Sequence, residues 1–301
     1  MTDKNRVIAL GFFDGIHIGH SALLERALAV ARETDRIPSV ITFDTSPKSF
    51  VTGNPVELIN SPEDRAGLIH RIFGIEDVIF LHFDRTTAEI KWNEFIEMLH
   101  ADFGASYLIA GRDHRFGHRG EGDADKLKAY CEERGIGCGI IPEVIYKGAA
   151  CSSTLIRGLL KDGGISAANG YLGHPHVLTD VVRYGYRLGR TLGTPTINMR
   201  FGDGVLIPAR GVYATRVYLD GGEVRCGVTN IGTRPTVSGG DETVTAETHI
   251  IDYRANLYGH NVRIEFFERL RPEMRFSGTD ELKAQIQRDI ESVRKYFAGV
   301  T

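Results

Sequence analysis

Leu10-Gly11-Phe12-Phe13-Asp14-Gly15-Ile16-His17-Ile18-Gly19-His20 is the stretch that decides the fold of the first half of the chain. The apolar run 7–10 leads into it, and residues 21–32 follow with apolar side chains at helical spacing. The order is strand, glycine turn, helix. A helix start offers unpaired N–H groups and the positive end of a dipole, and glycines let the backbone approach an anion closely. His17 and His20 add two donors that can become cationic, so the stretch predicts a nucleotide phosphate site. The plainer alternative is a turn with two surface histidines.

Length and composition set the broad class. At 301 residues the chain is long enough for two hydrophobic cores, because a single core stops growing near ~250–300 residues. A net charge of −3, from 36 basic and 39 acidic residues, gives no basic field that favours nucleic acid. No apolar run reaches the ~18 residues of a membrane span, and the first residues carry no secretory pattern. We therefore expect a cytoplasmic protein without nucleic-acid or membrane partners. Its four scattered cysteines predict neither a disulfide framework nor a zinc site.

Strand-like and helix-like patterns alternate up to about residue 172. Between the strands lie helical patterns at 62–73, 87–103 and 123–134. This alternation predicts a doubly wound parallel sheet covered on both faces, in which ligands bind at the carboxyl ends of the strands. The predicted strands are 7–10, 39–43, 77–83, 106–110 and 139–145.

The pattern changes near residues 172–176. Short strands with glycine turns follow, and they predict an antiparallel β-barrel. A terminal helix is expected over 278–297, capped by Ser277 or Thr279. We place the two domains at residues 1–175 and 176–301. The predicted strands of the second domain are 177–186, 211–219, 223–230, 243–251 and 261–270.

Two further stretches carry chemistry. In 151–157, Ser153 is a good helix cap, Thr154 offers a hydroxyl near the helix start, and Arg157 lies one turn on, so the three predict an anion clamp. In 189–198, glycines and Arg190 suit a phosphate tail, while Thr196 and Asn198 place two oxygens on one side of an extended segment, as Mg²⁺ prefers. The plainer alternatives are a serine-capped helix and a glycine-proline turn.

These stretches together resemble the bifunctional riboflavin kinase/FAD synthetases. The first matches Gly-x-Phe-Asp-Gly-x-His-x-Gly-His, the longer form of the His-x-Gly-His signature of nucleotidyltransferases. The stretch 152–157 matches Ser-Ser-Thr-x-Ile-Arg, and 189–198 matches Gly-Arg-x-x-Gly-x-Pro-Thr-x-Asn. Further matches follow in the family's order at 206–213, 227–236, 247–252, 257–259 and 270–276, so the resemblance covers about residues 6–297.

For the first domain the resemblance implies FMN adenylyltransferase activity, with ATP as co-substrate and FAD as product. His17 and His20 would hold the α/β-phosphates, and Ser153, Thr154 and Arg157 the leaving pyrophosphate, with Mg²⁺ assisting. Two departures lie beside this site: His114 stands where the family usually has Phe, and residues 45–47 lack the histidine of Pro-His-Pro. The other implied nucleotide-binding residues are Gly11, Phe12, Phe13, Asp14, Gly19 and Asp113.

For the second domain the resemblance implies riboflavin kinase activity with FMN as product. Glu247 would act as the base on the riboflavin 5′-hydroxyl, although a pairing of Glu247 with His249 or Arg216 is the plainer reading. Thr196 and Asn198 would hold Mg²⁺. The implied nucleotide-binding residues are Gly189, Arg190, Gly193 and Pro195, and the flavin-binding residues are Arg271, Glu273 and Phe276.

Riboflavin, FMN and ATP are thus the expected partners. Three alternatives stay open: a riboflavin kinase whose first domain is inactive or of altered nucleotide specificity, a flavin-binding module without catalysis, and a different His-x-Gly-His enzyme such as a cytidylyltransferase. The sequence leaves the oligomeric state open.

Overall fold

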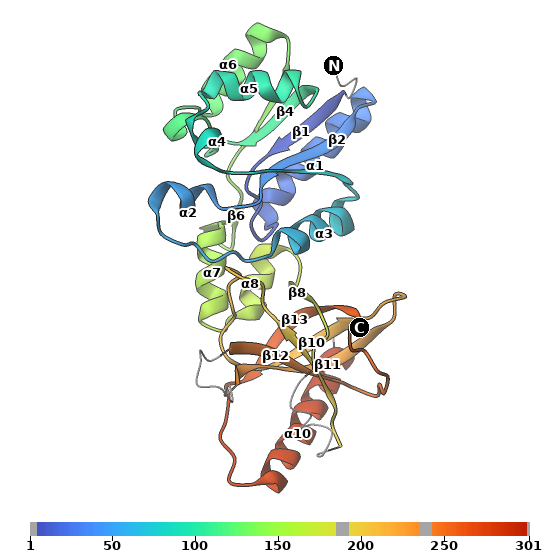
Figure 1. The fold of residues 1–301 in the computed structure, drawn as a ribbon. Helices are drawn as coiled ribbons and strands as arrows, with labels where there is room; N and C mark the ends of the chain where they lie inside the picture. The colour runs from blue at the N-terminus through green and yellow to red at the C-terminus, as the bar shows by residue number, and fades with distance from the viewer. Residues whose placement is uncertain (1–4, 185–192, 235–242, 300–301) are drawn as a thin grey trace. The chain divides into compact units, whose positions relative to one another are not determined.

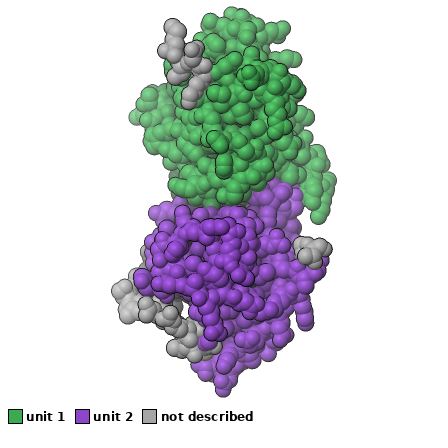
Figure 2. Space-filling model, turned by 90° about the vertical axis from the view of Figure 1, so that its right-hand side faces the viewer, with its two compact units in different colours: residues 1–153 green, residues 154–301 purple. Residues whose placement is uncertain are grey.

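The computed structural model describes residues 5–184, 193–234 and 243–299. The chain divides into two compact units, an N-terminal unit of residues 1–153 and a C-terminal unit of residues 154–301, which are coloured separately in Figure 2. The change of sequence pattern placed the domain boundary at 175/176, and that boundary stays a prediction.

A five-stranded parallel sheet forms the centre of the N-terminal unit, in the order β3-β2-β1-β4-β5. The chain moves outward from β1 through β2 and β3, and then returns to the other side of β1 for β4 and β5. The carboxyl ends of β1 and β4 therefore diverge at a switch point, where open parallel sheets bind ligands. The strands are β1 (Arg6–Leu10), β2 (Ile37–Phe43), β3 (Asp77–Leu81), β4 (Ala105–Gly111) and β5 (Gly137–Ile141).

Helices cover both faces of this sheet, as the alternating pattern predicts. Two of them, α5 (Trp92–Ala101) and α6 (Ala124–Arg134), pack against Ile8 and Leu10 of β1. On the other side, α1 (Ile18–Thr34) lies against β1, β2 and β4, and α3 (Pro62–Phe73) contacts α1 (Figure 1). The shorter elements are α2 (Pro47–Thr52), α4 (Arg85–Glu89), a 3₁₀ turn (His118–Gly120) and the hairpin of β6 (Ile145–Tyr146) and β7 (Ala149–Ala150).

Two predicted elements of this unit are wrong in extent. The expected helix 87–103 is two helices, because Ile90 is extended (φ −63°, ψ 126°) and the Lys91 N–H donates to the Glu94 carboxylate at the start of α5. The expected strand 139–145 ends at Ile141, since Pro142 has no N–H to donate to a ladder.

The C-terminal unit is a six-stranded antiparallel sheet in the order β8-β13-β10-β11-β12-β9. A bridge between Arg183, just beyond β8, and Asn198 of β9 joins the two edges, so the sheet curls into the predicted barrel. The strands are β8 (His176–Val181), β9 (Thr196–Arg200), β10 (Gly211–Tyr218), β11 (Val224–Arg234), β12 (Thr243–Ile250) and β13 (Asn261–Arg271).

Within the described residues, three helices accompany the barrel. The terminal helix α10 (Thr279–Ala298) packs Val293 and Phe297 against Val212 and Val228 of the sheet. The predicted cap of this helix is wrong: its N-cap is Gly278, which has no side chain, and the Ser277 hydroxyl and N–H both donate to the Glu281 carboxylate instead. The other helices are α7 (Ser153–Lys161) and α8 (Ile165–Leu172).

The structure also bears on cysteine, membrane and metal chemistry. All four cysteines are free thiols. Among the residues that the structure describes, no helix is long and apolar enough to cross a membrane. The same described residues contain no cluster of three or more His, Cys, Asp or Glu side chains that could hold a metal.

His176, at the start of β8, makes the stability of the barrel sensitive to acid. The residue is 1% exposed, neither ring nitrogen has a hydrogen-bond partner, and burial, reinforced by His174, lowers its pKa to about 3. Below pH ~6.5 the unfolded chain therefore takes up a proton that the folded chain refuses, and stability falls as the pH falls.

We expect His176→Phe to flatten this dependence by up to about 1.4 kcal/mol per pH unit between pH 6.5 and 5, because phenylalanine removes the titrating ring. Urea unfolding at pH 7.5, 6.0 and 5.0 measures the slope for both proteins. An unchanged slope in the variant would assign the proton uptake to another group.

Candidate active sites

The turn between β1 and α1 is strained and deeply buried. Phe13 (φ 54°), Gly15 (φ 87°) and Ile16 (φ 45°) all lie in the left-handed region, which a β-branched residue such as Ile16 rarely enters. Phe13 and Ile16 are both fully buried, so packing holds them there. Backbone strain of this kind costs about 1–3 kcal/mol per residue and persists only where the surroundings enforce it.

Asp14 fastens this turn to its neighbours. Its Oδ1 accepts hydrogen bonds from the backbone N–H groups of Ile59 (2.8 Å) and Asn60 (3.4 Å), and its carbonyl accepts one from the Ser153 hydroxyl (2.9 Å). The 153 segment thus reaches the turn, as the motif order predicts. The prediction that Ser153 caps a helix is wrong, because α7 begins at Ser153 itself and its hydroxyl binds Asp14.

His17 and His20 form a stacked pair at the start of α1. His17 is the N-cap, and its Nδ1 accepts the N–H of His20 (3.3 Å). The two rings lie 3.6 Å apart between centroids at 16°, and the Phe13 ring meets His20 edge-on at 5.2 Å. Gly19 leaves room for this stack, since a Cβ there would lie 3.1 Å from the His17 ring.

The electrostatic surroundings of His20 disfavour its protonated form. Burial, followed by the charges of His17 and Arg65, lowers the pKa of His20 well below 6.5. The neutral imidazole is therefore favoured in the free site, and the expected cationic form requires an anion beside the ring. Its Nδ1 is buried without a hydrogen-bond partner.

Arg65 of α3 is a site residue that the sequence analysis missed. It is fully buried, and its Nη1 donates to the carbonyl of Phe12 (2.5 Å) and to the Thr42 hydroxyl (3.0 Å). Its guanidinium lies 4.6 Å from the centroid of the Phe12 ring. Burial lowers the pKa of Arg65 to about 10, so it stays cationic and adds positive charge behind the turn. Arg65 lies three and four residues before Leu68 and Ile69, so helical spacing places it on the apolar face of α3, a signal that the sequence analysis did not use.

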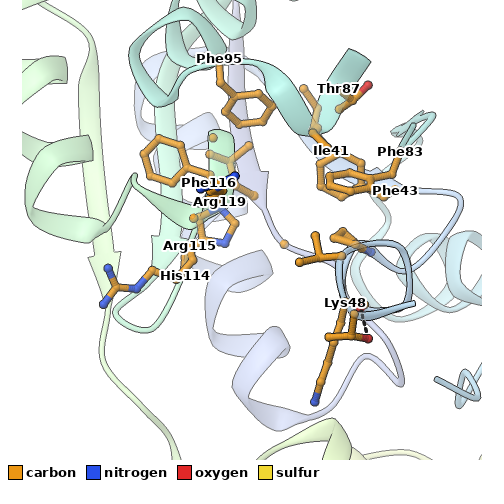
Figure 3. Close-up of a pocket in the computed structure, with 18 residues that line it drawn as sticks. Ile41, Phe43, Lys48, Phe83, Thr87, Phe95, His114, Arg115, Phe116 and Arg119 are labelled. Carbon is orange, nitrogen blue, oxygen red and sulfur yellow. Dashed lines mark hydrogen bonds between the residues drawn. The ribbon is translucent and has the colours of Figure 1, made fainter. Parts of the chain in front are cut away.

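An aromatic cavity of about 410 Å³ opens beside the turn, with Gly11 in its wall. In Figure 3 the rings of Phe43 and Phe83 lie on one side of this cavity and those of His114 and Phe116 on the other. Lys48, Arg115 and Arg119 add three cationic side chains to the lining (Figure 3). The residues come from the carboxyl ends of β1, β2 and β4 and from α2, which is the switch-point arrangement.

The remaining predicted residues of the first site are distributed as follows. Asp113 follows β4, with its carboxylate near Gly111. His114, a departure from the family pattern, lines the aromatic cavity, and burial lowers its pKa to about 4. Thr154 and Arg157 lie on α7, within residues 154–301 of the C-terminal unit.

Strand register assembles the second site. Asn198 of β9 pairs with Glu247 of β12, and Glu247 pairs with Asn230 of β11. Thr196 and His249 form the next pair on the same face. Paired residues of neighbouring strands share a face, so the two predicted metal ligands and the predicted base stand in adjacent rows.

The donors present fit a hard cation. Asn198 is 5% exposed and its Oδ1 has no hydrogen-bond partner, a state that costs free energy unless a ligand binds that oxygen. Thr196 places a half-buried hydroxyl two residues away on the same side of β9. Neutral oxygen donors of this kind suit Mg²⁺, which takes its other oxygens from water and phosphate.

Two cavities flank these rows. One of about 230 Å³ is lined by Glu247 and by all three predicted flavin-binding residues, Arg271, Glu273 and Phe276. The other, of about 520 Å³, is lined by Gly193, Pro195 and Thr196 and by the loop 253–258, whose part the sequence analysis did not anticipate. The predicted residues Gly189 and Arg190 lie outside the described residues.

The two proposed partners of Glu247 are engaged elsewhere. His249 Nδ1 lies 2.9 Å from the carbonyl of Pro195, and the Arg216 guanidinium lies over the rings of Phe267 and Phe297. These contacts of His249 and Arg216 do not involve Glu247, and the role of Glu247 as a base stays a prediction.

The N-terminal unit has a buried glycine turn at the switch point of a parallel sheet, as nucleotide-binding proteins do. The C-terminal unit has a carboxylate, Glu247, beside two oxygen donors, Thr196 and Asn198, on a barrel. These features define the class of protein as a nucleotide-dependent enzyme with one candidate site in each unit. Family models agree: an FAD synthetase model matches residues 1–155, and a riboflavin kinase model matches residues 172–297. The chain belongs to the bifunctional riboflavin kinase/FMN adenylyltransferase family.

Individual relatives carry this family name over nearly the whole chain. The protein from Listeria monocytogenes is 32% identical over 99% of this chain and 94% of its own. The Escherichia coli K12 protein is 36% identical over 98% and 93%. A solved structure from Streptococcus pneumoniae, described as a macrolide-efflux protein, superposes with a TM-score of 0.85 at 30% identity, over 98% of this chain and 95% of that one.

The contacts of Asp14 predict a stability effect. We expect Asp14→Ala to lower the free energy of unfolding by about 1–3 kcal/mol, because two buried backbone N–H groups lose their acceptor. Asp113→Ala, in the exposed loop after β4, is the control and should stay within about 0.5 kcal/mol. Urea unfolding compares them, and equal losses would mean that the Asp14 hydrogen bonds add nothing.

Proposed function

We propose that the chain makes flavin cofactors in two steps: the C-terminal unit phosphorylates riboflavin to FMN with ATP, and the N-terminal unit adenylylates FMN to FAD and releases pyrophosphate. Small molecules are the only partners that this proposal requires, and neither nucleic acid nor a membrane has a part in it. We expect a cytoplasmic enzyme.

The aromatic cavity beside Gly11 is the observation that carries the first-site proposal. A flat tricyclic ring with an anionic tail fits an apolar space walled by phenylalanines and edged by Lys48, Arg115 and Arg119. Because Gly11 belongs both to this wall and to the turn, a flavin bound there directs its phosphate toward the nucleotide site. FMN is therefore the acceptor that the shape and charge of this cavity favour.

Adenylyl transfer needs positioning and charge neutralisation rather than a covalent intermediate. An FMN phosphate oxygen attacks the α-phosphorus of ATP, and the bond to the pyrophosphate oxygen breaks in line. His17 and His20, with the N–H groups at the start of α1, donate to the phosphate oxygens whose charge grows. The phosphate's own negative charge raises the pKa of His20 from its low value in the free site, so binding strengthens the donor.

In the second reaction Glu247 takes the proton of the riboflavin 5′-hydroxyl as that oxygen attacks the γ-phosphorus of ATP and ADP leaves. The cavity with Arg271, Glu273 and Phe276 binds the flavin beside Glu247, and the cavity with Gly193 and Pro195 binds the nucleotide. Bound Mg²⁺ supplies neutralisation of phosphate charge, and Thr196 and Asn198 would hold it.

A riboflavin kinase with a silent first domain is the second candidate. His114 favours it, because a polar ring replaces the usual Phe in the wall of the aromatic cavity. A time course with riboflavin, excess ATP and Mg²⁺, followed by chromatography, decides between the two. FMN that rises and then gives way to FAD supports both activities, whereas FMN that accumulates alone supports the kinase only.

We expect His20→Ala to lower FAD formation from FMN by about 10²–10³-fold, because one donor to the developing phosphate charge is lost. FMN formation from riboflavin should continue unchanged. His70→Ala, on the exposed face of α3, is the matched control. Full FAD formation in His20→Ala would remove His20 from the reaction.

We expect Glu247→Gln to lower FMN formation by about 10²–10⁴-fold, because the amide cannot take the hydroxyl proton. Conversion of supplied FMN to FAD is the internal reference and should be retained, and Glu223→Gln in the exposed turn before β11 is the control. Normal phosphorylation of riboflavin by the variant would contradict a catalytic Glu247.

A further inference from the structure

The cavity beside Glu247 is lined by a buried ion pair, in which Arg271 belongs to a matched motif and Asp289 does not. Arg271 is the last residue of β13, and its guanidinium makes a bidentate interaction with the Asp289 carboxylate of α10. Nε donates to Oδ1 (3.0 Å) and Nη2 donates to Oδ2 (2.7 Å). The two side chains are 16% and 6% exposed, and both line the cavity. The fork geometry fixes the plane of the guanidinium as well as its position.

Further hydrogen bonds extend the pair in both directions. Gln285, one turn earlier on α10, donates to Asp289 Oδ1 (2.8 Å), and Arg288 in turn donates to Gln285. On the other side, Arg271 Nη1 donates to the carbonyl of Pro272 (3.0 Å), and the guanidinium lies 6.0 Å from the Phe276 ring. Asp289 is thus connected through Arg271 to both ends of the loop 272–276.

The position of Asp289 on α10 explains how the helix restrains Arg271 and the loop 272–276. Val293 and Phe297 pack the C-terminal end of α10 against the sheet, while Leu282, Ile286 and Asp289 line the cavity from its preceding turns, up to the middle of the helix. The packed end anchors the helix, and Asp289 is the polar contact by which the middle of the helix holds the loop.

Stability alone does not account for such a pair. A buried ion pair is often no more stabilising than apolar residues of the same volume, because desolvation offsets the attraction. The same helix carries a second pair, Arg294–Asp252, which is 55% and 67% exposed and lies outside the cavity lining. The buried pair differs in fixing the geometry of a cavity wall.

We propose that Asp289 is a positioning residue of the riboflavin subsite: it holds the Arg271 guanidinium and the loop 272–276 in the geometry that binds the flavin ring. The inference rests on the proposed kinase function. Asp289 touches no reacting atom, so its loss should weaken riboflavin binding far more than it slows phosphoryl transfer.

The test compares Asp289→Asn with the wild-type chain. We expect the KM for riboflavin to rise by about tenfold or more while kcat stays within about threefold, the signature of lost binding common to ground and transition states. The matched control is Asp252→Asn, the same chemical change on the exposed pair, and it should leave the KM unchanged. Asp289→Glu, which restores the charge one methylene further out, should recover part of the KM.

A purely structural role gives a different result. It would lower the melting temperature and the active fraction of Asp289→Asn, and hence the apparent kcat, with an unchanged KM, and this outcome overturns the inference. FMN-to-FAD conversion, measured on the same samples, reports on the folding of the N-terminal unit. If Asp289→Asn does not fold, the KM of Asp289→Glu decides alone, and a wild-type value overturns the inference.

Measurements on the wild-type chain distinguish failure of the proposed function from failure of the inference about Asp289. A wild-type chain that neither binds riboflavin, by quenching of its fluorescence, nor phosphorylates it overturns the function and the inference together. Should the wild-type chain bind riboflavin without turnover, the ratio of Kd values between Asp289→Asn and wild type replaces the KM. An unchanged Kd then overturns the inference.

Discussion

Burial of the turn after β1 is the constraint on which the first site depends. Phe13 and Ile16 hold left-handed backbone conformations that isolated residues avoid, and both side chains are fully buried. Packing of the surrounding sheet and helices offsets the free-energy cost of this strained backbone. The sharp turn lets α1 begin at Ile18, only seven residues after Gly11. The N–H groups at the start of α1 and the aromatic cavity lined by Gly11 therefore lie at the same edge of the sheet. Asp14 then connects this edge to residues 59–60 and to Ser153.

In the barrel, strand register takes the place of a strained turn. Asn198, Glu247 and Asn230 come from segments far apart in the sequence, and pairing of β9 with β12 and of β12 with β11 puts them in one row. A slip of one residue in β12 would turn Glu247 into the barrel interior and bring Thr248 to its place. The interior opposes that slip, because Thr248 is fully buried and its hydroxyl lies 2.8 Å from that of Thr229, which lies 2.8 Å from that of Thr215. The interior ladder therefore fixes the position of the exterior site.

Periodicity and glycine punctuation predicted the order and type of the longer strands and helices, because parallel and antiparallel strands and amphipathic helices each leave a local pattern. Short elements such as α2, α8 and β9 were not predicted, since five to eight residues carry too little periodicity. In the N-terminal unit the errors in extent arise at Ile90 and Pro142, where backbone conformation changes without a change in hydrophobicity. Motif resemblance located His17, Glu247 and the flavin-loop residues, which do lie together with their expected neighbours. Arg65 and Asp289 escaped prediction for another reason. Each is a charged residue at an apolar-face position of its helix pattern, Arg65 beside Leu68 and Ile69 and Asp289 between Ile286 and Val293, and only tertiary packing shows what its charge contacts.

Burial also explains how the sites stay poised for charged ligands. Nε and Nη2 of Arg65, Nδ1 of His20 and Oδ1 of Asn198 are buried polar atoms without a partner, each of which costs free energy in the free protein. Such atoms are not diagnostic by themselves, since His176 at the start of β8 carries two of them and belongs to neither predicted site. At the two sites, however, the charge or polarity of these atoms suits the proposed ligand. The Arg65 guanidinium and the His20 ring belong to the phosphate site, and Asn198 Oδ1 lies on the same strand face as Thr196, where Mg²⁺ is proposed. A ligand of opposite charge supplies the hydrogen bonds or charges that these buried atoms lost on folding. The recovered free energy then contributes to ligand binding.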